Sequence, residues 1–238
     1  MTAPLYVLVG SSEVAQPGAR TARITARIKV SQRQVYFAIA IQTLIVVLAF
    51  ASPAFAHHPF GGTTPGSWLE GFLSGLGHPI IGPDHLVFTV LIGLLAALLS
   101  PGWAVIGTFL AAALAGTGLH LLAIDLPAPE FTIALSVLLV GALVARVQQL
   151  PILAVLLLTA GAGLFHGYAY GEAIVGAEMT PLVAYLIGFT AVQGAIATVA
   201  YGLIRRMLDP TQRLARLRTV GLLACGAGAA LLASVVLS

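Results

Sequence analysis

Six long apolar runs, almost free of charged side chains, constrain this chain more than any other feature of its sequence. Hydrophobic residues make up 59% of the chain and charged residues only 8%, which is too little polar surface to cover a protein in water. A helix needs about 20 apolar residues to cross a bilayer core of about 30 Å. The runs have this length, and segments rich in Pro, Gly and polar residues separate them. The sequence therefore predicts an all-α integral membrane protein, a bundle of about six transmembrane helices.

The predicted transmembrane domain covers residues 80–238, with helices over residues 80–99, 103–123, 130–148, 150–168, 181–205 and 217–237. An outer segment over residues 57–79 precedes it. In this segment "SWLE" has the form of a capping box, with Ser67 as the cap and Glu70 as its partner. It predicts a short helix from Trp68 to about Leu76 that lies in the membrane interface.

The first 56 residues have the features of an export signal. Five basic residues precede the apolar run "VYFAIAIQTLIVVLAF", namely Arg20, Arg23, Arg27, Lys29 and Arg33. Ala54 and Ala56 then form an A-x-A cleavage site. We expect a signal peptide over residues 1–56, either cleaved to leave His57 as the first residue or retained as an anchor. Both cases place residue 57 on the outer side of the membrane.

The basic residues after the signal indicate the orientation of the helices. All of them fall in or beside the loops predicted to face the cytoplasm: Arg146, Arg205, Arg206, Arg213, Arg216 and Arg218. This distribution follows the positive-inside rule. It predicts a multi-pass protein of the bacterial inner membrane, with the mature N-terminus and the C-terminus outside. The same distribution gives no indication of nucleic-acid binding, so the expected partners are the lipid bilayer and an ion.

Histidines and carboxylates gather at the outer ends of the predicted helices. The stretch "GHPIIGPDHL" carries His78, Asp84 and His85, with a predicted helix break at Gly82 and a helix start at Pro83. Asp84 and His85 are then expected near the hydrocarbon boundary, where polar groups are costly and usually functional. Taken alone, Asp84 is also explained by the helix dipole, and each histidine by a hydrogen bond to a carbonyl.

Imidazole nitrogen and carboxylate oxygen without thiolate favour nickel, cobalt or zinc as the bound ion. The single cysteine, Cys225, excludes a thiolate cluster. The principal candidate ligands are His78, Asp84, His85 and His166, and the weaker ones are His57, His58, His120, Glu172 and Glu178. No prosthetic group is expected, because the metal would be cargo.

Two motifs resemble those of the HupE/UreJ family of nickel/cobalt permeases. "HPIIGPDH", from His78 to His85, has the family's H-x5-D-H pattern, and "FHGYAYGE", from Phe165 to Glu172, resembles its Phe-His-Gly box in the fourth span. The resemblance implies uptake of nickel or cobalt through His78, Asp84, His85 and His166. The family box commonly continues with a second histidine and then a glutamate. Here Tyr170 and Ala173 stand at those positions, with Glu172 and Glu178 as substitutes.

A permease, rather than an enzyme, is therefore the expected function. The chain contains no G-x-x-x-x-G-K-[ST] motif and hence no P-loop ATPase site of its own. Two alternatives stay open on the residues alone: a zinc-dependent intramembrane hydrolase with Asp84 as the general base, and an accessory membrane subunit that binds metal without transporting it.

Overall fold

The computed structural model describes residues 5–14, 22–30, 64–146, 151–207 and 209–237. The chain divides into two compact units, Met1–Leu44 and Ile45–Ser238. The predicted cleavage site at Ala54 and Ala56 and the candidate ligands His57 and His58 lie outside the described residues. The predictions made for them stay predictions.

The described part of the first unit is a β-hairpin. Strand β1, Leu5–Val14, pairs antiparallel with strand β2, Ala22–Val30, with Leu5 opposite Val30 and Val14 opposite Ala22. Both runs carry residues that favour strands, Tyr and Val in β1 and Ile, Thr and Val in β2, and "PG" stands between them, a composition typical of a hairpin. The hairpin falls within residues 1–56, for which the sequence predicts a signal peptide and no strands.

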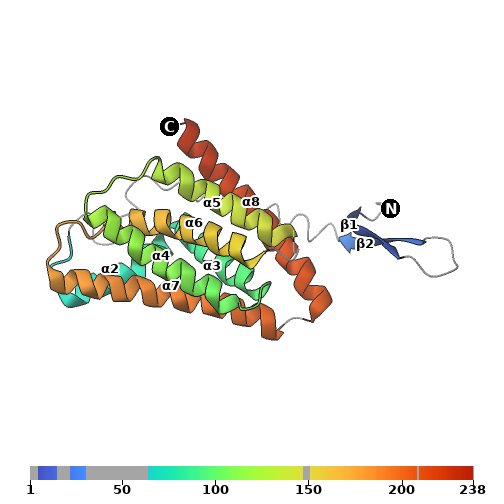
Figure 1. Ribbon diagram of the computed structural model, residues 1–238, viewed down its shortest axis with the longest axis horizontal. Coiled ribbons are helices and arrows are strands. Elements are labelled where there is room, and N and C mark those ends of the chain that lie inside the picture. Colours follow the sequence, from blue (N-terminus) through green and yellow to red (C-terminus); the bar gives the residue numbers. More distant parts are fainter. Residues whose placement is uncertain (1–4, 15–21, 31–63, 147–150, 208, 238) are drawn as a thin grey trace. The chain divides into compact units, whose positions relative to one another are not determined.

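The second unit is helical throughout its described elements (Figure 1). Its helices are α2 (Trp68–Ile81), α3 (Pro83–Ala97), α4 (Gly102–Leu121), α5 (Pro129–Arg146), α6 (Ile152–Glu172), α7 (Met179–Met207) and α8 (Pro210–Leu237). Among the described residues, five helices are long and apolar enough to cross a membrane, or six spans if the bent pair α2–α3 counts as one. The predicted bundle of about six transmembrane helices is confirmed.

A sharp break separates α2 from α3. The two helices meet at an angle of 81°, and Gly82 between them has an extended backbone with φ −75° and ψ 108°. Pro83 occupies the first turn of α3, where its missing N–H leaves no bond unmade. The predicted break at Gly82 and helix start at Pro83 are both confirmed.

The bounds of α2 differ from the prediction at one end. Ser67 caps the helix as predicted, because its hydroxyl oxygen accepts a 3.3 Å hydrogen bond from the backbone N–H of Glu70. The helix does not end near Leu76, however, and runs through Pro79 to Ile81. Residues beyond the predicted end pack inside the bundle as well: His78 and Pro79 are buried, and Nδ1 of His78 lies 3.2 Å from the Tyr185 hydroxyl of α7. These tertiary contacts accompany a helix that continues past its own proline.

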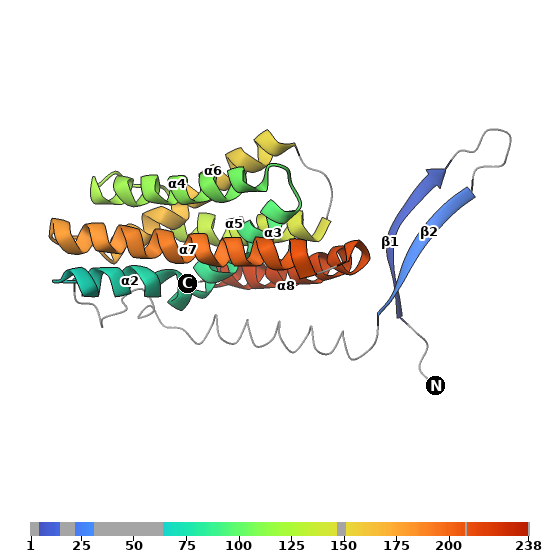
Figure 2. The ribbon, with the colours of Figure 1, turned by 90° about the horizontal axis from the view of Figure 1, so that it is seen from below.

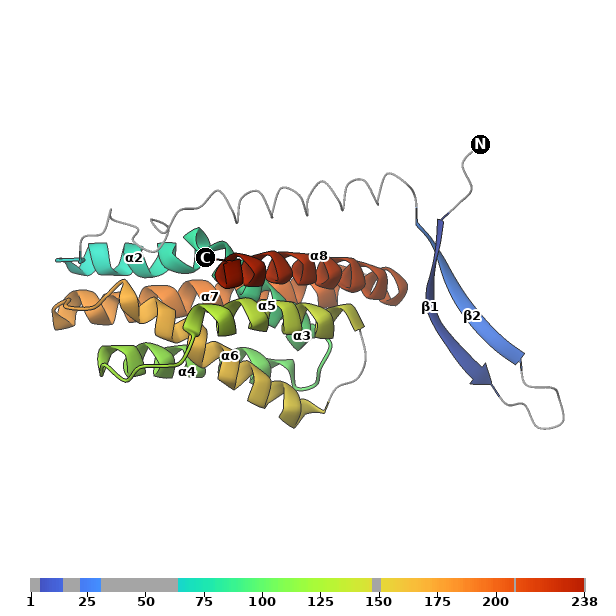
Figure 3. The ribbon, with the colours of Figure 1, turned by 90° about the horizontal axis from the view of Figure 1, so that it is seen from above.

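Three close helix pairings build the bundle. Helices α2 and α3 both lie along α7, α4 lies along α6, and α5 lies along α8 (Figures 2 and 3). Glycines allow these backbones to approach, since a Cβ on Gly116 would collide with Leu164 of α6 and one on Gly221 would collide with Ala145 of α5. At the α2–α3 break, Pro79 and Gly82 are buried, whereas Ile80 and Ile81 are 49% and 46% exposed, so one side of the break faces the bundle and the other faces outward.

The break between α2 and α3 lies beside the middle of α7 and not beside either of its ends. Gly75 of α2 meets Tyr185 in the second turn of α7, whereas Gly93 of α3 meets Ala197 much further along the same helix. Helices α2 and α3 therefore lie one after the other along α7, which is continuous. The His85 side chain is fully buried among the helices, with 0% exposed, and Asp84 beside it is partly buried. Their expected place near the hydrocarbon boundary stays a prediction.

Candidate metal-transport site

Three histidine side chains from three helices meet in the core of the bundle. His78 comes from α2, His85 from α3 and His166 from α6, and their exposed fractions are 1%, 0% and 0%. The ring centroids of His78 and His85 lie 5.7 Å apart, and those of His85 and His166 lie 5.1 Å apart. The structure thus brings together three of the four principal candidate residues.

A hydrogen-bond relay fixes the protonation of the His85–His166 pair. The Ser136 hydroxyl donates its one proton to the carbonyl oxygen of Ile133 at 2.7 Å, so it must accept from Nε2–H of His166 at 2.9 Å. In a neutral His166 ring, Nδ1 is then the acceptor, and it lies 2.9 Å from Nδ1 of His85. His85 therefore donates through Nδ1–H. The relay assigns the lone pair of neutral His85 to Nε2.

A second relay fixes His78 in the same way. The Tyr185 hydroxyl donates to the backbone carbonyl oxygen of Tyr170 at 2.7 Å, so at 3.2 Å it accepts from Nδ1–H of His78. The lone pair of neutral His78 is again on Nε2. Metal-binding histidines in proteins are usually held this way, with one nitrogen donating to an oxygen and the other left as the ligand.

Tyr170 fills the space between these two histidines. Its side chain is fully buried, and its ring centroid lies 4.6 Å from that of His85 and 5.2 Å from that of His78. Its hydroxyl donates to Oε1 of Gln193 in α7 at 3.4 Å. Tyr170 stands at the position where the resembled family commonly has its second histidine, so the substitution falls inside the site.

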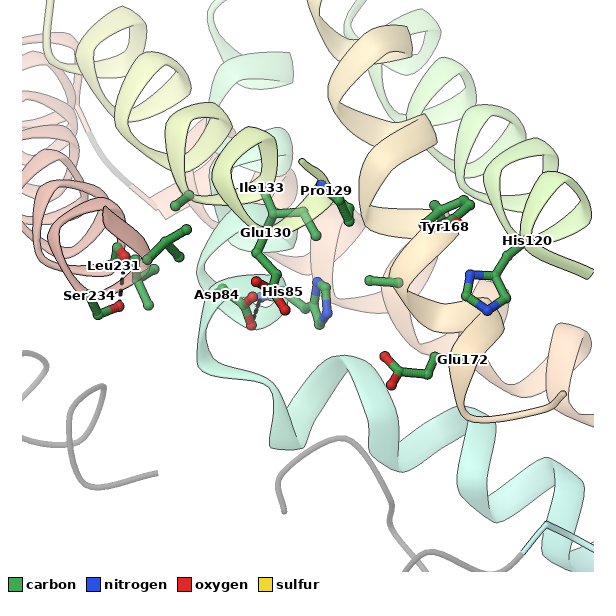
Figure 4. A pocket seen from close by; sticks show the side chains of 13 residues that line it. Asp84, His85, His120, Pro129, Glu130, Ile133, Tyr168, Glu172, Leu231 and Ser234 are labelled. Atoms are coloured by element: carbon green, nitrogen blue, oxygen red, sulfur yellow. Dashed lines mark hydrogen bonds between the residues drawn. The ribbon is translucent and has the colours of Figure 1, made fainter. Parts of the chain in front are cut away.

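A cavity of about 350 Å³ reaches one of these three histidines, His85, and three carboxylates line it: Asp84, Glu130 and Glu172 (Figure 4). His85 and His120 also line it, and its lining contains no lysine or arginine. The Asp84 carboxylate accepts the backbone N–H of His85 at 2.9 Å, which fixes the acid next to the buried imidazole. The cavity therefore links a cluster of negative charge with His85.

The weaker candidates separate into two groups. His120 and Glu172 line the cavity, and the His120 ring packs edge-on against Tyr168 with centroids 4.5 Å apart. Glu178 does not line it and is exposed just before α7. Of the substitutes considered for the missing family glutamate, only Glu172 is at the cavity.

Three further residues belong to the site but were not among the predicted ligands. Glu130 is a carboxylate in the first turn of α5, and its place in an outer loop was the signal that could have identified it. Ser136 and Tyr185 act through the histidines. A hydroxyl in an apolar run gives no local sign of the imidazole it will contact, so only the tertiary structure identifies them.

The site is not a complete coordination shell. Within the described ranges, no three His, Cys, Asp or Glu side chains are placed so that they could hold one ion together. Two lone-pair nitrogens, a neighbouring carboxylate and an acidic cavity are what the arrangement offers.

Comparison with known proteins identifies the family of the chain. The family model described as "HupE / UreJ protein" matches residues 45–231. Protein HupE of Rhizobium leguminosarum bv. viciae is 32% identical over 165 residues, which cover 68% of this chain and 82% of that protein. No solved structure matches the chain significantly. The chain belongs to the HupE/UreJ family.

Proposed function

We propose that this protein is a membrane permease for divalent nickel or cobalt ions, with the buried histidines as its selective step. The acidic cavity collects the ion, and His85 and His78 receive it in turn. The ion is cargo in this proposal, and the protein itself carries out no reaction.

The observation that carries the proposal is the pair of lone-pair nitrogens set by two hydrogen-bond relays. Nε2 of His85 and Nε2 of His78 carry their lone pairs because Nδ1–H is committed in both rings. Neutral imidazole nitrogen is a ligand that nickel, cobalt and zinc share. Burying two such groups in an apolar bundle is costly, and polar residues at this depth usually mark an ion pathway.

The broken helix supports the same function. Transporters commonly place their sites where a membrane helix is interrupted, because irregular backbone is tolerated there only beside a cavity or inside the protein. Here the α2–α3 break carries His78 on one side and Asp84 and His85 on the other. His166, with both ring nitrogens engaged, orients His85 and is not itself a ligand in this state.

The membrane potential can drive the ion inward without a nucleotide. A divalent cation that crosses a potential of about 100 mV gains roughly 4.6 kcal/mol, which supports about a thousandfold accumulation. In the proposed orientation the cavity opens outside, and the arginines at the junction of α7 and α8 face the cytoplasm.

The test is uptake of radioactive nickel and cobalt by cells that express His78→Ala, His85→Ala or the wild type at matched membrane abundance. Each histidine variant is expected to lose at least nine-tenths of the uptake, since each removes one of the two nitrogen ligands. Tyr168→Phe is the matched control, because Tyr168 lines the cavity but its hydroxyl donates only to the exposed Asp125. Equal uptake by control and histidine variants, or no uptake by the wild type, would contradict the proposal.

A further inference from the structure

A second cavity, of about 450 Å³, lies at the end of the bundle where α7 ends. It is lined by Trp103, Thr198, Tyr201, Gly202, Arg205 and Arg206, and we call it the basic cavity. All but Trp103 share one face of α7 at helical spacing, and Trp103 comes from the first turn of α4. The basic cavity is far along the chain and along α7 from the histidine site, and the proposed transport does not use it.

Aromatic rings hold the first of its two arginines in place. The Arg205 guanidinium lies 5.5 Å from the centroid of the Tyr201 ring, and Nη1 donates to the Tyr201 hydroxyl at 3.2 Å. The Trp103 and Tyr201 rings lie 4.9 Å apart. A guanidinium has five N–H donors, so Arg205 retains donors for an anion.

The charge in the lining of this cavity is one-sided, and Asp209, which follows α7 in the sequence, is outside the lining and accepts the backbone N–H of Gln212 at the start of α8. The lining contains no carboxylate, and no ion pair involves Arg205 or Arg206 among the described residues. Arg213 adds a further positive charge nearby, since its Nη2 donates to the carbonyl oxygen of Arg205 at 3.2 Å. An anion is therefore the ligand that this cavity fits by charge.

Apolar surface adjoins the basic residues on the same helix. Val199 and Leu203 lie next to the cavity residues along α7, and 58% and 49% of their surfaces are exposed. Trp103 is 57% exposed. Trp and Tyr are favoured at the level of lipid headgroups, where one part of the ring is apolar and another is wet. A ligand with both a phosphate and acyl chains would use the two arginines and the apolar surface together, whereas a free phosphate would use only the arginines.

We propose that the basic cavity binds the headgroup of an anionic phospholipid, with the phosphate at Arg205 and Arg206 and an acyl chain along Val199 and Leu203. Guanidinium groups suit phosphate because their planar N–H pairs match its oxygens. The lipid belongs to the leaflet at this end of the bundle.

Tryptophan fluorescence tests the proposal at the cavity itself. The chain has two tryptophans, so Trp68→Phe leaves Trp103 as the single reporter. The variant is placed in phosphatidylcholine vesicles that contain a minor fraction of phosphatidylglycerol brominated close to the glycerol, which quenches a tryptophan at contact. Matched vesicles carry brominated phosphatidylcholine instead. Stronger quenching by the brominated phosphatidylglycerol is expected.

Three double variants on this background separate the effect of the cavity from that of general positive charge. Arg205→Gln with Arg206→Gln is expected to lower the preference for phosphatidylglycerol at least fivefold, which corresponds to about 1 kcal/mol, because the phosphate loses both of its guanidinium partners. Arg216→Gln with Arg218→Gln removes the same charge from α8, outside the cavity, and is expected to keep the preference. Arg205→Lys with Arg206→Lys retains the positive charge and is expected to keep most of the preference for phosphatidylglycerol.

Three results would overturn the proposal. The first is equal quenching by the two brominated lipids. The second is an equal loss of preference in both glutamine double variants, which would show attraction by net charge alone. The third is displacement of the brominated phosphatidylglycerol by an equal concentration of glycerol phosphate, which would assign the cavity to a soluble phosphate. Circular dichroism of each variant in phosphatidylcholine alone checks that the helices are intact.

Discussion

At the scale of the residue, the hydroxyl groups of Ser136 and Tyr185 determine which ring nitrogen of each histidine carries the proton. His85 and His78 contact each other and groups on α6 and α7, and their Nδ1–H protons are held by His166 and Tyr185. The oxygens of Ser136 and Tyr170 in turn fix those partners. The site can therefore be altered without touching a proposed ligand, and a change in an orienting residue tests the relay itself.

Tyr185→Phe is expected to raise the half-saturating metal concentration of uptake by about 10- to 100-fold, the usual effect of losing a group that orients a metal ligand. Without the hydroxyl, Nδ1–H of His78 loses its acceptor, and the lone pair is no longer confined to Nε2. Uptake measured over a range of nickel concentrations gives the shift. Ser136→Ala is expected to act in the same direction through His166, and unchanged affinity in both variants would argue against the relays.

Tyr170→His is expected to strengthen metal binding by the purified protein. The Tyr170 ring centroid is 4.6 Å from that of His85 and 5.2 Å from that of His78, so an imidazole there would come within reach of the same ion. Equilibrium dialysis with nickel measures the affinity. Tyr170→Phe, which keeps the ring and removes only the hydroxyl, is the control and should leave the affinity near that of the wild type.

At the scale of the element, glycines determine how α2 and α3 reach their places along α7. Both helices approach α7 at positions where a side chain cannot fit, notably Gly75 and Gly93. Close approach brings His78 within hydrogen-bond distance of Tyr185, so the packing of this pair also positions the site. A glycine inside a helix that contacts no other helix, such as Gly107, does not position a neighbouring helix.

Gly75→Ala is expected to destabilise the protein by about 1 to 3 kcal/mol, the usual cost of forcing extra volume into a packed core. The added Cβ would meet the backbone of Tyr185 and Phe189. Gly107→Ala in α4 is the matched control, because its Cβ meets nothing within 4 Å, and alanine is the better helix former. Unfolding midpoints in one detergent compare the two variants, and equal midpoints would contradict the packing argument.

At the scale of the whole bundle, charge separates along the helices. Three carboxylates line the cavity beside His85, while Arg205 and Arg206 lie at the far end of α7. In the proposed orientation this pattern suits a cation that enters from outside and an inner face that meets anionic lipid. It also requires that the ion cross most of the membrane field.

Uptake is therefore expected to depend on the membrane potential. In vesicles loaded with potassium, valinomycin sets an inside-negative potential, and nickel influx should rise steeply with it, since each 100 mV contributes about 4.6 kcal/mol for a divalent ion. Influx that stays constant as the potential is varied would contradict uniport of the free ion. Vesicles that carry His85→Ala give the background.

The sequence by itself determined the class of protein, the approximate spans and the identity of the polar residues. Hydrophobic runs of bilayer length leave few alternatives, because every backbone polar group in lipid must be bonded within a helix. Gly82 and Pro83 likewise favour a local break, since Pro83 disfavours helical backbone at the residue before it and Gly82 adopts the extended backbone at little cost. These are local constraints, and the structure confirms them.

Only the tertiary structure decided that the break lies beside the middle of α7, that Tyr185 and Ser136 hold the histidines, and that Glu130 joins Asp84 and Glu172 at one cavity. Hydrophobicity does not distinguish a helix face that meets lipid from one that meets another helix. His85 and His166, 81 positions apart, become neighbours through the packing of whole helices. That packing depends on the shapes of all the helices together, and no short motif records it.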